Sequence, residues 1–406
     1  MQRPTTKRPW AILAAGAAIQ VLTGLPAAWG VFQQPVMEEY GLSEQGAGLA
    51  FGILIAAFGV GCVIGGFLQD QKGPRCAGLW GTALLCGGFF AAAGLPGEMG
   101  GVFWAAFSVP AGLGTAFLYP SIQSCAQKWY AGRKGLATGV IGGAVGLSGA
   151  FLTVFVRAAL QGFGPVQGIR GAFWALGAIT LPVCLVGSAL LTDPPPAKPK
   201  PSEQGRGKAA PALDLSPTQM LRTRQYWLCA GAVCASTPAV LLFSPIILKL
   251  GMERGLDENA ALWSVVLGSV GSAAGRLLMP LLSDKIGRRP TDLILFGVSF
   301  GLSGLFWAAQ GWAVVACYAG LTFCYSALAA VLPALSTDLF GFPHAGVNYG
   351  FLALGQSVGS LLFPFLANLW GWQAGRHVLA MAGAAAGFGA IWALRPVAPP
   401  KGPKPN

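Results

Sequence analysis

A single arginine lies inside an apolar stretch of the chain, in the segment "GSAAGRLLMPLLSDKIGRRP" (Gly271–Pro290). Arg276 is flanked by small and aliphatic residues, and the next acidic residue along the chain is Asp284. A guanidinium keeps its proton in proteins, and a buried charge is costly unless it is paired. Its planar fork of N–H donors fits a carboxylate with two parallel hydrogen bonds. The position therefore predicts an anion-binding arginine.

The sequence offers Arg276 no obvious acidic partner, because no acidic residue is placed deep within an apolar stretch. The fourteen acidic residues fall near the ends of such stretches or between them, at Glu38, Glu39, Glu44, Asp70, Glu98, Asp193, Glu203, Asp214, Glu253, Asp257, Glu258, Asp284, Asp292 and Asp338. We therefore predict that the counter-ion of Arg276 is a bound ligand. The alternative is a structural arginine that donates to backbone carbonyls or pairs with an end carboxylate such as Asp338.

The sequence contains no pattern of residues typical of a catalytic or metal-binding site. The nine cysteines are scattered without a Cys-x-x-Cys pair, and the two histidines, His344 and His377, lie near the ends of apolar stretches. The glycines of "GVGCVIGG" (Gly59–Gly66) lack the strand that precedes a dinucleotide fingerprint and instead predict close packing of helices. We expect no metal, no cofactor and no enzymatic activity.

The composition is that of a membrane protein. Hydrophobic residues make up 54% of the 406 residues and charged residues only 10%, where a soluble domain has about 25% charged residues. Mean hydropathy is +0.60. An arginine deep in a membrane helix costs about 2.5–3.5 kcal/mol on insertion scales, which strengthens the functional interpretation of Arg276.

Twelve apolar runs are long enough to span a bilayer, which takes roughly 20 residues each. They predict an all-α membrane protein of twelve transmembrane helices in two pseudo-symmetric six-helix bundles. The runs are 10–32, 46–69, 76–95, 100–125, 135–160, 170–192, 226–249, 259–283, 291–309, 312–336, 346–368 and 374–395.

One long polar segment separates the two sets of six runs. We assign residues 1–192 to a first bundle, 193–225 to a linker and 226–406 to a second bundle. The Pro/Lys-rich first part of the linker should be extended. Its end, "SPTQ" (Ser216–Gln219), predicts a capped short helix that lies at the membrane interface, with Met220, Leu221 and Trp227 facing the bilayer.

The positive charge is distributed unevenly between the two sets of loops. The formal net charge is +12, but we attribute it to membrane topology rather than to nucleic-acid binding. One set of loops, with the linker and both chain ends, holds most of the basic residues. The opposite set holds only Arg157, Arg170, Lys249, Arg254 and Arg376. The basic side should be cytoplasmic, which predicts a multi-pass inner (plasma) membrane protein with both termini inside the cell.

Two loops repeat between the halves. "GGFLQDQKGPR" (Gly65–Arg75) follows the second run and "MPLLSDKIGRR" (Met279–Arg289) follows the eighth. Two parallel halves joined by a linker predict a transporter with its substrate site between them, near the midplane. The loop charges Asp70 with Arg75, and Asp284 with Arg288, are candidates for a gate that holds one access state; the alternative is a solvated, topology-determining loop.

These paired loops resemble the signature of the major facilitator superfamily, and the resemblance covers essentially the whole chain. The first loop departs from the signature at Gln71 and Pro74, where basic residues are usual. Further stretches are similar to the monocarboxylate porter and oxalate–formate antiporter branch, namely Leu118–Gly146, Gly275–Pro290, "VLPALSTDLFG" (Val331–Gly341) and "NYGFLALGQSVGSLLFP" (Asn348–Pro364). The branch implies transport of small carboxylates, by proton symport or by anion exchange.

The resemblance also suggests which residues meet the substrate. In the family, an arginine in the context of Arg276 binds carboxylate, and a tyrosine at the place of Tyr119 lies in the pocket. Oxalate-type members carry a second cation where this chain has Gln356, so a single carboxylate is expected here. Animal-type porters carry an acid at the place of Ser272, so their proton relay cannot be transferred to this chain.

Two further polar residues, Tyr325 in the tenth run and Asn348 at the start of the eleventh, are weaker candidates for the pocket. Together these features predict symport of a lactate- or pyruvate-like monocarboxylate with protons across a lipid bilayer, without nucleic acid as a partner. Because no acid is placed deep in a run, the proton would travel with the substrate or reach an acid at a helix end. Carboxylate exchange, as in oxalate/formate antiport, is the alternative.

Overall fold

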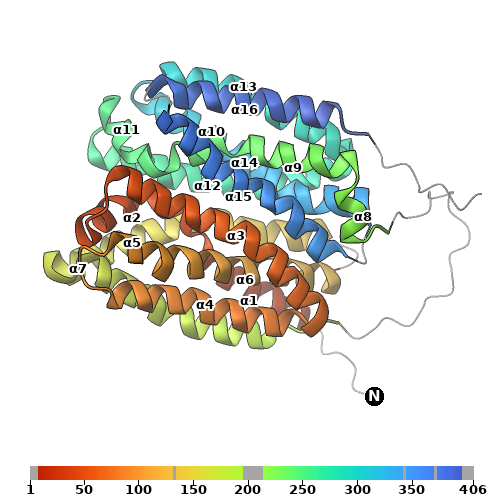
Figure 1. Cartoon of the computed structure of the whole chain (residues 1–406), viewed down its shortest axis with the longest axis horizontal. Helices are drawn as coiled ribbons and strands as arrows, with labels where there is room; N and C mark the ends of the chain where they lie inside the picture. Colours follow the sequence, from red (N-terminus) through yellow and green to blue (C-terminus); the bar gives the residue numbers. More distant parts are fainter. Residues whose placement is uncertain (1–7, 131–133, 195–213, 342–343, 370–372, 396–406) are drawn as a thin grey trace, which may run out of the picture.

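The computed structural model describes residues 8–130, 134–194, 214–341, 344–369 and 373–395. Most of the predicted linker and both chain ends lie outside the described residues. So does Arg133, one of the basic residues in the set of loops predicted to be cytoplasmic. The described chain is helical, with no strand in these ranges. The long helices run side by side along one axis, and the first-half helices lie against the second-half helices (Figure 1).

The first half begins with two helices separated by Gly24, which together form one membrane-length segment, Pro9–Tyr40. Gly164 and Gly168 divide the longest helix into two segments, Leu136–Gly164 and Gly168–Leu190. The elements of this half are α1 (Arg8–Thr23), α2 (Leu25–Tyr40), α3 (Glu44–Lys72), α4 (Pro74–Gly94), α5 (Gly100–Phe103), the π-helix η1 (Trp104–Ser108), α6 (Val109–Trp129) and α7 (Lys134–Leu190).

The second half begins with a short helix and a broken membrane-length segment, Arg224–Glu253. That segment is interrupted at Thr237, between α9 and α10. The elements are α8 (Pro217–Leu221), α9 (Arg224–Ser236), α10 (Pro238–Leu241), the 3₁₀ helix η3 (Ser244–Ile246), α11 (Ile247–Glu253), α12 (Glu258–Ile286), α13 (Arg288–Ala308), α14 (Trp312–Phe340), α15 (Ala345–Leu369) and α16 (Gln373–Trp392).

Eleven segments of the described chain are long and apolar enough to cross a membrane. The twelfth predicted helix is present as α16, whose first turns contain Arg376 and His377 and are therefore less apolar. The predicted all-α architecture is confirmed, and most helix ends fall within a few residues of the predicted ones. The largest difference is the first segment, which continues through "VFQQPVMEEY" to Tyr40 because this polar part packs against the protein.

The two halves meet along two helix pairs, α3 with α15 and α7 with α12. Small residues permit the close approach. A Cβ on Gly59 would lie 2.9 Å from the Ala353 carbonyl oxygen, and one on Gly350 would lie 2.7 Å from the Cys62 carbonyl oxygen. In membrane helices such contacts replace the hydrophobic driving force that lipid does not supply. The glycines of Gly59–Gly66 therefore serve packing.

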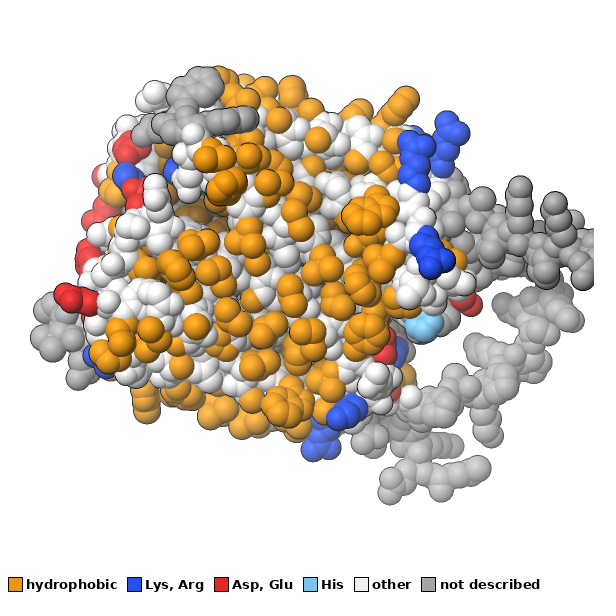
Figure 2. Space-filling model, in the orientation of Figure 1, with side chains coloured by type: hydrophobic (Ala, Val, Ile, Leu, Met, Phe, Trp, Pro, Cys, Tyr) orange, Lys and Arg blue, Asp and Glu red, His pale blue; other side chains and the backbone are white. Residues whose placement is uncertain are grey.

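The two ends of the bundle differ in charge. Lysine and arginine gather at the end that carries α8, and most of the aspartate and glutamate visible in this view lies at the opposite end (Figure 2). We call these the basic end and the acidic end. Lys72 and Arg75, where α3 passes into α4, lie at the basic end, and Glu44, at the start of α3, lies at the acidic end. Between them the surface is largely hydrophobic (Figure 2).

The short helix α8 has the predicted cap but a different environment. The Ser216 hydroxyl accepts from the Gln219 backbone N–H, and the Gln219 side chain accepts from the Ser216 N–H. The prediction that Met220 faces the bilayer is wrong. Met220 is fully buried in a cluster with Phe340 and Leu352, so α8 is anchored to the second half, whereas Trp227 is 67% exposed.

Candidate functional site

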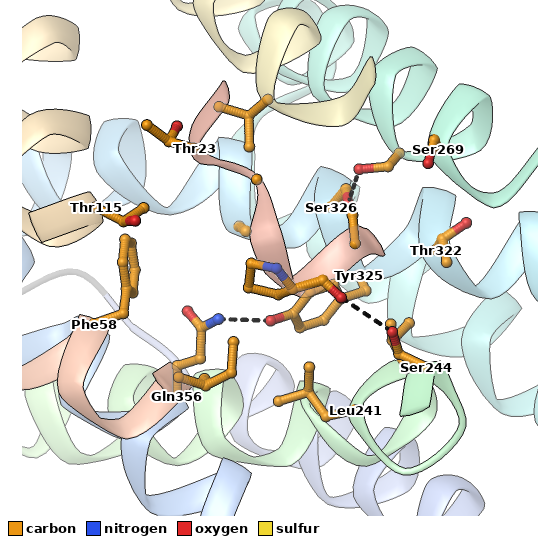
Figure 3. A pocket seen from close by; sticks show the side chains of 18 of the residues that line it. Thr23, Phe58, Thr115, Leu241, Ser244, Ser269, Thr322, Tyr325, Ser326 and Gln356 are labelled. Atoms are coloured by element: carbon orange, nitrogen blue, oxygen red, sulfur yellow. Dashed lines mark hydrogen bonds between the residues drawn. The ribbon is translucent and has the colours of Figure 1, made fainter. Parts of the chain in front are cut away.

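A cavity of about 140 Å³ lies between the halves, lined by residues from both. A cavity of roughly 150 Å³ can hold a molecule the size of benzene, so this space suits a small organic ligand. Figure 3 shows Thr23, Phe58 and Thr115 of the first half on one side, facing Ser269, Thr322, Tyr325 and Ser326 of the second half.

Arg276 lines this cavity from α12, about two thirds of the way from the acidic end of that helix. Its Cβ lies beside Gly142 of α7, where an added Cβ would approach it to 3.2 Å. Its Nε is buried and has no hydrogen-bond partner, and no ion pair to Arg276 occurs among the described residues. Arg276 is the only charged side chain among the described residues that line the cavity.

Tyr119 of α6 lines the same cavity from the first half. Its side chain is 6% exposed, and its hydroxyl is within hydrogen-bonding reach of the Arg276 guanidinium. The Phe58 ring lies 6.2 Å from the Tyr119 ring, measured between centroids. A buried tyrosine hydroxyl needs a polar partner, and the nearby Arg276 guanidinium can serve as one.

Tyr325 of α14 and Gln356 of α15 form one unit at the cavity wall. The Gln356 side-chain amide donates to the Tyr325 hydroxyl at 2.7 Å (Figure 3). The Tyr325 hydroxyl thus accepts from Gln356 and keeps its own proton free to donate. Both residues line the cavity together with Arg276.

Ser272 lies one turn before Arg276 on α12 and also lines the cavity. Its hydroxyl is 2.6 Å from the Ser326 hydroxyl of α14. Ser272 is therefore part of the polar wall, and it has a protein partner already.

Sequence reasoning missed much of this polar wall. Tyr318, Thr322 and Ser326 line the cavity beside Tyr325, all from α14. Their spacing of three to four residues places them on one face of that helix. A polar face at this spacing within an apolar run was the signal that could have identified them.

The structure does not bring Asn348 into the cavity. Its side chain is completely buried near the start of α15, and its amide donates to the Leu215 carbonyl at 3.2 Å. The segment before α8 is thereby tied to α15. We therefore leave Asn348 out of the proposed site.

The gate candidate Asp70 makes a contact between the halves. Its carboxylate lies at the start of α15, beside Gly346 and near the Val347 backbone N–H. A carboxylate at a helix N-terminus satisfies free N–H groups and interacts favourably with the helix dipole. Arg75 is exposed, and no ion pair joins it to Asp70 in the described chain.

The second gate candidate connects helices of the second half only. Asp284 pairs with Arg288 at 2.5 Å, and Arg288 also reaches Asp338 at 3.3 Å and the Ser283 hydroxyl. These contacts join the ends of α12, α13 and α14.

Ion pairs that the sequence did not suggest cross between the halves at the acidic end. Lys249 pairs with Glu44 at 3.1 Å, and Arg157 pairs with Glu258 at 3.3 Å. All four side chains are substantially exposed, so each pair is worth about 0–1 kcal/mol. Together with the contact of Asp70, they join the two halves at both ends of the cavity.

Comparison with protein families decides the classification. The family model described as Major Facilitator Superfamily matches residues 12–291 and 242–406. The chain belongs to this superfamily. It is therefore a multi-pass membrane transporter, as its two six-helix halves suggest. The solved structure of the superfamily transporter FucP in the outward conformation has the same fold, with a TM-score of 0.66, 14% identity, and coverage of 94% of this chain and 97% of that one.

Among curated members of the superfamily, two relatives are carboxylate transporters by name. The oxalate:formate antiporter of Oxalobacter formigenes is 25% identical over 362 residues, which cover 87% of this chain and 83% of the antiporter. The human monocarboxylate transporter 11 is 26% identical over 301 residues, which cover 72% of this chain and 60% of that protein.

Proposed function

We propose that this superfamily member transports small monocarboxylates such as lactate or pyruvate by alternating access. The observation that carries the proposal is Arg276, a permanent cation in a small cavity between the halves, with a buried Nε that no protein group satisfies. An anionic ligand would supply the missing acceptor and would neutralise the charge. The names of the two relatives support a carboxylate as that anion.

In the proposed complex, the Arg276 fork holds the two carboxylate oxygens. The hydroxyls of Tyr119 and Tyr325 lie at the same cavity and can donate to the bound anion. Phe58 and its apolar neighbours on α3 then meet the short organic tail. Charge-assisted bonds orient one end of the ligand, and apolar contact limits the size of the other end.

The residue at position 356 supports a ligand with one carboxylate. Gln356 lines the cavity with a neutral amide, and that amide already donates to Tyr325. A second carboxylate would meet no second cation among the described lining residues. Its desolvation would therefore not be compensated.

We propose proton symport as the coupling mode and the inner (plasma) membrane as the location, with the basic end in the cytoplasm. Carboxylate exchange is the second candidate, favoured by the similarity to the oxalate:formate antiporter. Symport predicts lactate accumulation driven by a pH gradient, whereas exchange predicts uptake that depends on internal substrate.

The proposal is tested by uptake of a panel of radiolabelled carboxylates into proteoliposomes, for wild type and Arg276→Gln. Wild type should transport lactate or pyruvate, and Arg276→Gln should lose that uptake. Arg224→Gln is the matched control, because Arg224 is an exposed arginine at the start of α9. If Arg276→Gln transports as wild type does, Arg276 is structural and the proposed site is wrong.

A further inference from the structure

Asp292 is a buried acid that the site described above does not use. The sequence places it near the start of α13, four residues after Arg288, where a solvated carboxylate would be ordinary. In the structure its side chain is 4% exposed, and its Oδ1 is buried with no hydrogen-bond partner. Asp292 thus lies near a helix start, as the sequence indicates, but its carboxyl group is buried there.

A second cavity, of about 40 Å³, separates Asp292 from the carboxylate site. Tyr325, Tyr349 and Gln356 line both this cavity and the larger one that contains Arg276. The Gln356–Tyr325 hydrogen bond lies in the shared wall. A space of this size holds about one or two waters, which could relay a proton between Asp292 and the site.

The described groups that surround Asp292 include no cation that pairs with it, so they do not hold it in the ionised form. Tyr325 of α14, Tyr349 of α15 and Cys229 of α9 line the cavity with it, and α16 contributes the apolar Ile391. Arg288, one turn earlier on α13, is the nearby cation, but it already pairs with Asp284 and Asp338. A buried carboxyl group without a dedicated cation is inexpensive as the neutral acid and costly as the anion, so it is suited to exchange a proton.

The first half shows that the fold does not need an acid here. When the two repeated loops are aligned on Asp70 and Asp284, Gly78 falls opposite Asp292. Gly78 packs tightly, since an added Cβ would lie 2.9 Å from the Ser188 hydroxyl oxygen. The second half has an acid and a cavity at the position where the first half is closed.

We propose that Asp292 carries the coupled proton, and this inference rests on the proposed proton symport. In the loaded carrier, Arg276 binds the substrate carboxylate and Asp292 is protonated. After release of substrate and proton, the Asp292 carboxylate balances Arg276 while the empty carrier returns. The summed charge of Arg276, Asp292 and substrate is zero in both states. A carrier with one ligand missing would move an uncompensated charge through a low-dielectric interior, which is costly.

The test uses purified full-length protein in proteoliposomes, with radiolabelled lactate and a trapped pH-sensitive dye. Asp292→Asn keeps the shape of the protonated acid but cannot release a proton. One pH unit sets a limit of about tenfold accumulation for one-to-one coupling. Asp292→Asn should show no accumulation and no lactate-driven proton entry, while lactate exchange at equal pH stays within about twofold of wild type, because the binding site is intact.

Two further variants make the outcome decisive. Asp292→Glu should restore proton-coupled accumulation at least in part. Asp214→Asn is the matched control, because Asp214 is an exposed acid just before α8 at the basic end. Its accumulation and proton entry should equal those of wild type.

The results separate the inference from the function on which it rests. If wild type takes up lactate without proton entry, the proposed symport is wrong, and the role of Asp292 fails with it. If wild type is coupled and Asp292→Asn is equally coupled, only the inference about Asp292 fails. Loss of both lactate binding and exchange in Asp292→Asn and Asp292→Glu would mean that Asp292 serves folding, and would also overturn the inference.

Discussion

The two halves share one scaffold but divide the chemistry unequally. In the alignment of the repeated loops, Arg276 falls opposite Cys62, and Asp292 falls opposite Gly78. Cys62 is fully buried and packs with Ala116 and Ala353. Both ionisable positions of the second half are therefore occupied by closely packed small residues in the first half.

This difference suggests how a repeated fold acquires a directional site. The first half gives the cavity a rigid wall, with Tyr119 as its hydroxyl donor and Phe58 as its apolar contact. Behind that wall lies an aromatic cluster in which Phe107 and Phe173 have ring centroids 4.9 Å apart. Because Arg276 and Asp292 both belong to the second half, the cation and the acid keep their relative positions when the halves move against each other.

The largest expected effect comes from placing the first-half residue at the position of Arg276 in the second half. Arg276→Cys should lower lactate uptake by roughly 30-fold or more, since loss of one partner from a buried charge pair costs about 2–5 kcal/mol. Cys62→Ser, the matched change in the first half, should stay within about twofold, because Cys62 does not line the cavity. Initial rates of labelled lactate uptake test both. Equal losses in the two variants would contradict the division between the halves.

A second variant adds a further positive charge to the second half. Gln356→Lys places a second cation beside Arg276 and should favour dicarboxylates, with oxalate competing about tenfold better against lactate. Gln356→Met is the control for size without charge and should not improve oxalate. Competition assays measure the shift. If Lys and Met give the same oxalate affinity, the single-carboxylate argument is wrong.

The smallest expected effect concerns the loop acids of the two halves. Asp70→Asn should weaken a contact that crosses to α15 by about 0.3–1 kcal/mol, because Asp70 is exposed, and hydrogen exchange in residues 346–350 should rise about two- to fivefold. Asp284→Asn alters an exposed pair within the second half and should leave that exchange unchanged. Hydrogen–deuterium exchange mass spectrometry compares the two. Faster hydrogen exchange in the first turn of α15 in both variants would mean that the two loops have the same role.

Local patterns explain what could be predicted from the sequence. Apolar runs specified the helices, the repeat specified two halves, and Arg276 was conspicuous because its neighbours are apolar. The depth of Asp292 could not be predicted, because its position near a helix start does not reveal which side faces a cavity. Met220 was wrongly assigned to the bilayer, because the sequence of a short helix does not show whether lipid or protein covers an apolar residue.

The two interrupted segments at the front of each half have a mechanical consequence. The first breaks at Gly24, after Thr23, and its counterpart breaks near Thr237, which falls opposite Thr23 in the same alignment. Beyond the breaks the two segments touch, where the Ser244 hydroxyl donates to the Pro26 carbonyl at 3.2 Å. A helix bends most easily where its hydrogen-bond ladder is interrupted. The short helical segments that follow Gly24 and Thr237 lie between the cavity and the acidic end. They can therefore bend at these two breaks before a whole half rotates.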